Sequence, residues 1–241
     1  MSDARSPETP LSPTAAETVR FPLRGQPRAA YYARPDSAGP FPGVVVIHEA
    51  FGLNQNIRDV TRRFAGAGYA ALAVDLFAGR NPAVCMARFI GQMLSGSTDN
   101  SSIDEFKAAL DWLGARPEVS GSRLGAVGFC MGGTFAIAWA CSDQRLQVIA
   151  PFYARNPRPL EATRRMCPVV GSYPDRDFTT EPGRKLDAEL TTASIPHDIK
   201  IYPNTKHSFF NDRGATHDPA ASADAWQRIM TYFSERLGTA G

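Results

Sequence analysis

The sequence lacks the features that would place it at once in several large classes of protein. Its apolar runs, such as Val44–Ile47, are far shorter than the roughly 18 residues needed to cross a bilayer. The 26 basic and 24 acidic side chains nearly cancel, leaving a formal net charge of +2. We therefore expect no transmembrane segment, and no nucleic acid or anionic membrane as a partner, because each of those partners calls for an excess of basic groups.

Cysteine is also scarce. The four cysteines, at positions 85, 130, 141 and 167, have neither the paired spacing of a metal site nor the density of a disulfide framework. The first ten residues are polar and rich in proline, whereas a secretory signal peptide has an apolar centre. The sequence thus predicts a cytoplasmic protein with reduced thiols and without a bound metal or cofactor.

Short apolar segments alternate with longer amphipathic ones along most of the chain. The 241 residues, 43% of them apolar, suffice for one hydrophobic core, so we expect a loose tail over 1–18 and a single domain over 19–241, as a monomer or homodimer. The alternation is typical of βαβ units, which form a mostly parallel sheet with helices on both faces. The predicted strands are 43–47, 69–74, 123–129, 147–152, 168–172 and 197–202, with two antiparallel edge strands near 17–21 and 29–33, and the predicted helices lie near 56–66, 83–94, 102–113, 131–141, 182–193 and 220–237.

One strand exit has the pattern of a nucleophile elbow. The strand ending at Phe129 is followed by Cys130 and then by an apolar helix, in the pattern Gly-x-Cys-x-Gly-Gly that places Gly128 and Gly132 on either side of the cysteine. The elbow needs small flanks because strand and helix approach closely there, and the nucleophile occupies a strained backbone position. The helix start favours a thiolate. The alternative is that Cys130 is a small buried apolar residue, which is how we interpret the other cysteines.

A thiol with its ordinary pKa of about 8.5 is mostly protonated at neutral pH, so a cysteine nucleophile requires a nearby base. His207 is the best placed of the four histidines, because it lies in the loop that follows a predicted strand late in the chain. His48 ends the first core strand, His197 begins a strand at the opposite edge, and His217 lies in a polar loop. We therefore predict that His207 is the base, with a surface histidine as the alternative.

An acidic residue should orient this histidine. In α/β-hydrolases the order along the chain is nucleophile, acid, histidine, which directs attention to the strand exit between Cys130 and His207. Asp175 and Asp177 both lie there, and spacing alone does not choose between them, since acids in turns are commonly solvated or capping residues.

The exit of the first core strand carries Glu49 and Ala50. In this fold that loop supplies one backbone amide of the oxyanion hole, and the residue after the nucleophile supplies the other. The candidate amides are therefore those of Ala50 and Met131. A carboxylate beside a forming oxyanion would be repulsive, so we interpret Glu49 as a hydrogen-bond partner of the resting thiol, or else as a partly solvated loop residue.

Four motifs in this order resemble the dienelactone hydrolase family of α/β-hydrolases over roughly residues 20–237. They are His-Glu-Ala-Phe-Gly-Leu-Asn at 48–54, Gly-Phe-Cys-Met-Gly-Gly at 128–133, Gly-Ser-Tyr-Pro-Asp-Arg-Asp at 171–177 and His-Ser-Phe at 207–209. The resemblance implies a triad of Cys130, Asp177 and His207, and favours Asp177 over Asp175 because the family's loop commonly reads Gly-Gly-x-Asp. It also implies that Glu49 holds the resting thiol until substrate displaces it.

The chain departs from this family where the prototype binds the carboxylate of its substrate. The prototype has an arginine four residues after the catalytic histidine, where this sequence has Asn211, with Arg213 close by. A second anchoring arginine lies on a helix after the strand that ends near Asp75, and Arg88 is the nearest basic residue. The resemblance therefore implies hydrolysis of a small ester or lactone, and the departure at Asn211 leaves open whether dienelactone itself is a substrate.

Aromatic residues follow several of the strand exits. Phe51, Phe77, Phe89 and Phe209 could line a small apolar substrate pocket, although aromatics at such spacings commonly belong to the core. Two other functions are consistent with the sequence: a catalytically silent α/β-hydrolase that binds a small molecule or a protein, and a thiol redox sensor at Cys130, which would need a second cysteine within reach.

Overall fold

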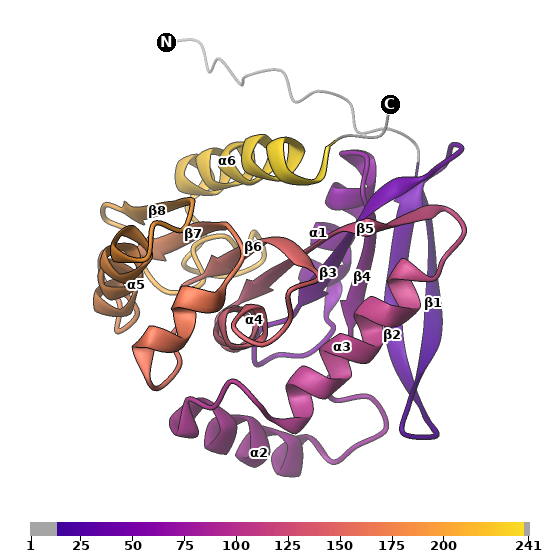
Figure 1. The fold of residues 1–241 in the computed structure, drawn as a ribbon, viewed down its shortest axis with the longest axis horizontal. Coiled ribbons are helices and arrows are strands. Elements are labelled where there is room, and N and C mark those ends of the chain that lie inside the picture. Colours follow the sequence, from indigo (N-terminus) through magenta and orange to yellow (C-terminus); the bar gives the residue numbers. More distant parts are fainter. Residues whose placement is uncertain (1–13, 239–241) are drawn as a thin grey trace.

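The computed structural model describes residues 14–238, and its centre is an eight-stranded sheet (Figure 1). The strands are β1 (Thr14–Leu23), β2 (Gln26–Pro35), β3 (Phe41–Ile47), β4 (Ala70–Val74), β5 (Val119–Phe129), β6 (Leu146–Phe152), β7 (Val169–Pro174) and β8 (His197–Tyr202). Their order in the sheet is β1-β2-β4-β3-β5-β6-β7-β8. The pairs β1–β2 and β2–β4 are antiparallel and the others are parallel, which confirms the predicted α/β class with antiparallel strands at one edge.

The prediction of a loose tail over residues 1–18 is wrong for its last five residues. Residues 14–18 belong to β1, where Thr14 pairs with Pro35 and Thr18 with Tyr31. An edge strand is held by backbone hydrogen bonds to a single neighbour and leaves many side chains in solvent, so its sequence carries no strong apolar pattern. Residues 1–13 lie outside the described part of the chain.

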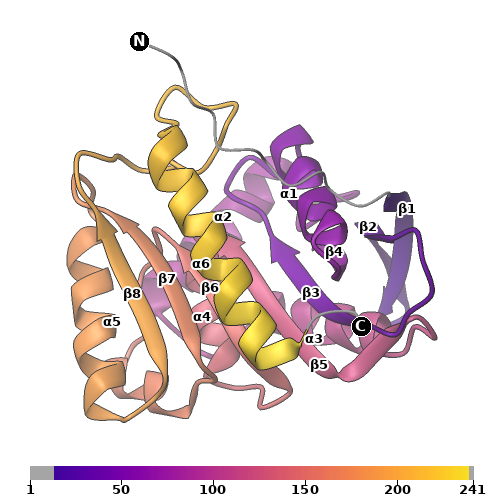
Figure 2. The same cartoon turned by 90° about the horizontal axis from the view of Figure 1, so that it is seen from above.

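Helices cover both faces of the sheet, as predicted. They are α1 (Gln55–Gly66), α2 (Pro82–Ser95), α3 (Ser101–Gly114), α4 (Met131–Ala140), α5 (Thr180–Thr192) and α6 (Pro219–Leu237), with a 3₁₀ helix (Leu160–Arg165) that the sequence pattern did not predict. Helices α1 and α6 share one face, and α2 to α5 contribute to the core on the other (Figure 2).

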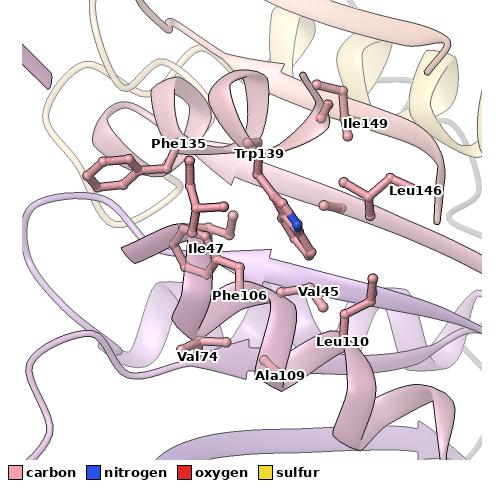
Figure 3. Close-up of a cluster of buried hydrophobic side chains, with 14 of the residues drawn as sticks. Val45, Ile47, Val74, Phe106, Ala109, Leu110, Phe135, Trp139, Leu146 and Ile149 are labelled. Atoms are coloured by element: carbon pink, nitrogen blue, oxygen red, sulfur yellow. The ribbon is translucent and has the colours of Figure 1, made fainter. Parts of the chain in front are cut away.

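The sheet separates two apolar clusters because its central strands are buried on both sides. In β3, Val45 and Ile47 point into one cluster while Val44 and Val46 point into the other, as the two-residue repeat of a strand requires. Helix α4 is buried at all ten of its positions, and its Trp139 packs against Phe106 of α3 (Figure 3). This explains why the helix after Cys130 is apolar all round.

The parallel arrangement places the carboxyl ends of β3, β5, β6, β7 and β8 at one edge of the sheet, which is where ligands bind in open α/β sheets. None of the helices in residues 14–238 has both the length and the apolar composition needed to cross a bilayer. Within the same residues, no three His, Cys, Asp or Glu side chains are grouped so that they could hold a metal ion.

Candidate active site

Cys130 occupies the turn between β5 and α4 in a strained conformation. Its φ is +54°, in the left-handed region that side chains other than glycine adopt at a cost of about 1–3 kcal/mol. The backbone is held there by a 3.1 Å hydrogen bond from Cys130 N to the carbonyl oxygen of Phe152, and by a 3.0 Å bond from Thr134 N to the carbonyl oxygen of Cys130. The side chain is partly exposed, so the thiol is accessible at the edge where the strands end.

The glycines around Cys130 are there because the backbones touch. A Cβ atom on Gly128 would lie 2.2 Å from the carbonyl oxygen of Gly132, and one on Gly132 would lie 2.3 Å from that of Ile47. Neither position can hold a side chain without moving the backbone. The contact with Ile47 also shows that the start of α4 lies directly against the end of β3.

His207 and Asp177 are joined by a hydrogen bond. His207 Nδ1 donates to Asp177 Oδ2 at 2.8 Å, and the Asp177 side chain is only 6% exposed. The same oxygen accepts hydrogen bonds from the Thr179 hydroxyl group and, at 3.3 Å, from Thr179 N. Burial alone would raise the pKa of Asp177, but the hydrogen bonds from His207 and Thr179 outweigh it and hold that pKa below its ordinary value. Asp177 is therefore a carboxylate.

The imidazole of His207 also faces Cys130. Burial favours the neutral ring, but hydrogen bonds to Asp177 and Cys130, together with their charges, raise the pKa of His207 to about 10. The structure thus brings Cys130, His207 and Asp177 together. Asp175, the alternative acid, has its Oδ1 buried without a hydrogen-bond partner among residues 14–238.

Two aromatic rings contact the imidazole of His207, and the sequence analysis assigned a role to neither. Tyr153 lies with its ring centroid 4.9 Å from that of His207, at an interplanar angle of 55°. Phe178 lies at 5.1 Å and is nearly parallel, at 19°. Tyr153 directly follows β6 and has a φ of +36°, so the rule that directed attention to strand exits could have found it.

Glu49 is buried, and its described hydrogen-bond partners are not the thiol. Its Oε1 accepts hydrogen bonds of 3.0 Å from the hydroxyl groups of Tyr153 and Ser208, and its Oε2 accepts one of 3.4 Å from Asn211 Nδ2. The expected bond between Glu49 and the resting thiol of Cys130 is therefore replaced in this conformation. Three neutral donors satisfy the carboxylate, while the cysteine faces the histidine.

His48 fixes the loop that carries Glu49. The ring is fully buried, and burial lowers the pKa of His48, so the ring is neutral. Its Nε2 accepts a 3.1 Å hydrogen bond from Leu76 N, so its Nδ1 carries the proton and donates to the carbonyl oxygen of Glu49 at 2.5 Å. This neutral histidine ties the exit of β3 to that of β4.

The candidate oxyanion amides lie on segments that touch. Ala50 is the first residue of the turn after Glu49, and Met131 is the first residue of α4. The first backbone N–H groups of a helix have no partner within the helix. Because Gly132 is in contact with the end of β3, both amides lie at the edge of the sheet that carries Cys130.

The residues expected to bind substrate do not share one environment. Phe51 is 74% exposed beside Ala50 and is free to contact a ligand. Phe209 is fully buried and packs against Tyr153 and Tyr202. The expectation that it contacts substrate is therefore corrected: it belongs to the apolar core. Phe89 is likewise fully buried.

The two arginines considered above as carboxylate anchors interact with residues outside the group formed by Cys130, His207 and Asp177. Arg88 of α2 interacts electrostatically with Arg80, Glu105 and Arg28. None of these three residues belongs to that group. Its Nε and Nη2 atoms are buried without a hydrogen-bond partner in the described residues. Arg213 forms an ion pair of 2.7 Å with Asp59.

Comparisons with known proteins show which family this chain resembles. The sequence profile of the dienelactone hydrolase family matches residues 29–237. A protein of Saccharolobus solfataricus named "Putative carboxymethylenebutenolidase" is 32% identical over 244 residues, covering 85% of this chain and 92% of the relative. A Klebsiella pneumoniae crystal structure titled "Putative Dienelactone Hydrolase" superposes with a TM-score of 0.83 at 26% identity, covering 93% of this chain and 100% of the other. A dienelactone hydrolase-like promiscuous phosphotriesterase from metagenomic libraries has a TM-score of 0.82 at 27% identity, with coverages of 93% and 99%.

Proposed function

Because the chain belongs to the dienelactone hydrolase family and is a hydrolase of that kind, we propose that it cleaves small carboxylic esters or lactones through a thioester on Cys130. The observation that carries this proposal is the position of Cys130: it lies on a strained elbow and faces His207, whose other ring nitrogen donates to Asp177. A nucleophile, a base and an orienting acid are the groups that acyl transfer requires.

In the first half of the reaction, the sulfur of Cys130 attacks the carbonyl carbon of the substrate. The carbonyl oxygen becomes an oxyanion, which the backbone amides of Ala50 and Met131 stabilise. Removing one such donor, where a side chain supplies it, typically costs about 3–4 kcal/mol of transition-state stabilisation. The tetrahedral intermediate collapses by breaking the C–O bond, and His207 gives its Nε2 proton to the departing alkoxide. In a lactone this alcohol stays attached to the acyl group, so the ring opens.

In the second half, His207 acts as a base. It removes a proton from water, whose oxygen attacks the thioester carbon, and the new intermediate collapses with breakage of the C–S bond. The acid product leaves, and Cys130 and His207 return to their starting protonation. Asp177 supports both halves because its carboxylate stabilises the imidazolium and holds Nδ1–H.

Esters and lactones suit this nucleophile better than amides. A thiolate is a better leaving group than an amine, so a tetrahedral intermediate formed by Cys130 on an amide would expel the thiolate and return to substrate. Phe51 offers an exposed apolar contact beside the oxyanion amides, and Asn211 contributes a neutral side chain next to Glu49. These groups favour a small ester or lactone that carries no charged group close to the carbonyl that reacts.

Turnover of p-nitrophenyl acetate and of a small lactone, combined with intact-mass spectrometry, tests the proposal. We expect the wild type to release phenolate and to carry a transient acyl adduct, whereas Cys130→Ala shows neither. Cys85→Ala provides the matched control, since this cysteine is buried in α2. Absence of turnover in the wild type would favour a silent binding protein, and turnover that survives in Cys130→Ala would overturn the assignment of the nucleophile. If there is no turnover and the intact mass shows that Cys130 has been oxidised to a disulfide or a sulfenic acid, the result would favour a redox sensor.

A further inference from the structure

Phe178 is a large apolar side chain that remains 65% exposed. It stands between Asp177, which accepts the hydrogen bond from His207, and Thr179, which donates to Asp177 and is fully buried. Leaving a phenylalanine in water forgoes most of the free energy that its burial would contribute. Core packing therefore does not account for the position of this ring.

The contact that Phe178 makes is with the imidazole of His207. The two rings are nearly parallel, with an interplanar angle of 19° and a centroid distance of 5.1 Å. A cation within about 6 Å of the face of an aromatic ring is attracted by the ring's quadrupole. The stacked arrangement therefore favours the positively charged imidazolium over the neutral ring, and it restricts rotation of the imidazole out of its plane.

The other groups that face His207 act in different ways. Asp177 supplies a carboxylate and Cys130 a thiol group that can be charged, and both lie near the edge of the imidazole, where its nitrogens are. Tyr153 contacts the ring at a tilt, and its hydroxyl group is occupied by Glu49. Of the described contacts, only that of Phe178 presents an aromatic face parallel to the imidazole.

We propose that Phe178 is a positioning residue, whose ring holds the imidazole of His207 so that Nδ1 points at Asp177 and Nε2 at Cys130, and stabilises the imidazolium. The catalytic consequence rests on the proposed hydrolase function, but the effect on the imidazole does not. Because the pKa of His207 is raised to about 10, the ring is charged in the resting protein at neutral pH, and this is the form that the stack stabilises.

The test compares Phe178→Ala and Phe178→Leu, which lack an aromatic ring, with Phe178→Tyr, which keeps one. Leu94→Ala is the matched control, because Leu94 is also exposed, at 59%, but lies on α2. Since Phe178 is on the surface, its removal leaves no cavity. Proton NMR titration of the histidine ring signals, with that of His207 identified by its absence in His207→Gln, reports the imidazolium directly and requires no substrate.

We expect Phe178→Ala and Phe178→Leu to increase the proton dissociation constant of His207 about two- to fivefold, the range of an exposed cation–π contact, while Phe178→Tyr and Leu94→Ala match the wild type. With an active ester, kcat should fall while KM stays within about twofold. An unchanged dissociation constant in Phe178→Ala would overturn the proposal, and so would a rise in KM at constant kcat, which is the result for a substrate contact. If the wild type does not turn over esters, the proposed function fails but the titration still decides the role of Phe178.

Discussion

The hydroxyl group of Tyr153 donates a 3.0 Å hydrogen bond to Glu49, although the two residues lie at the ends of strands that are not neighbours. Tyr153 follows β6 and Glu49 follows β3, and the strand between them is β5, which leads to Cys130. Burial, together with the negative charge of Glu49, raises the pKa of Tyr153 well above its ordinary value, so the tyrosine remains a donor at any working pH. The hydrogen bond connects the segments that follow β3 and β6, on either side of the strand that leads to Cys130.

The first prediction concerns this bond. Tyr153→Phe keeps the ring that contacts His207 but removes a donor from a buried carboxylate, and we expect it to lower the free energy of unfolding by about 1–3 kcal/mol. Urea denaturation measures the change. Tyr173→Phe is the matched control: the Tyr173 hydroxyl group is buried without a partner among the described residues, so its loss should be neutral or stabilising. Equal effects of the two substitutions would contradict the assigned role of the bond.

The second prediction distinguishes the two aspartates of the loop after β7. Asp177→Asn removes the carboxylate that orients the imidazole of His207, and in a comparable triad this change lowers the rate by roughly 10⁴. Asp175→Asn, two residues away, should leave kcat/KM for p-nitrophenyl acetate nearly unchanged. The opposite ranking would show that Asp175 is the acid.

The third prediction is a pH dependence of stability. The pKa of His207 rises from its ordinary value of about 6.5 to about 10 in the folded protein, because its hydrogen bonds to Asp177 and Cys130 outweigh burial. The folded state therefore binds a proton that the unfolded state has released, and the stability from this group is complete below about pH 6.5 and is lost as the pH rises to about 10. His207→Gln should show a smaller decrease in the free energy of unfolding across this interval, as measured by urea denaturation at several pH values. Parallel curves for the two proteins would contradict the shift.

The fourth prediction concerns Glu105, whose side chain is 1% exposed. Arg80 donates to it at 2.9 Å, and Arg28 lies 3.7 Å away. Glu105→Gln would leave these guanidinium groups without their shared carboxylate, and removing one partner of a buried ion pair typically costs about 3–5 kcal/mol.

Thermal and urea denaturation of Glu105→Gln should be compared with Asp111→Asn. Asp111 is paired with Arg145, but both side chains are largely exposed, so this control should change stability by at most about 1 kcal/mol. If Glu105→Gln lowers the free energy of unfolding no more than the control does, the guanidinium groups around Glu105 are solvated by water and do not depend on its carboxylate.

Much of the architecture follows from local patterns. The alternation of short apolar runs with amphipathic segments predicts the order of strands and helices, because a strand buried on both faces and a helix with one apolar face have different periodicities. The pattern Gly-x-Cys-x-Gly-Gly predicts the elbow, since Gly128 and Gly132 stand where the structure leaves no room for a Cβ atom. The sequence by itself therefore determined the fold class and the close approach of strand and helix at Cys130.

Other features depended on packing between distant segments. Asp175 and Asp177 are equivalent by residue type and loop, and only the fold shows that Asp177 meets His207. Glu49 exchanges the expected thiol partner for donors that lie 104 and 159 residues further along the chain. Phe209 becomes part of the core. Periodicity describes which face of an element is apolar, whereas the partner of a buried polar group is decided by which loops the sheet order brings together, and that was settled only by the tertiary structure.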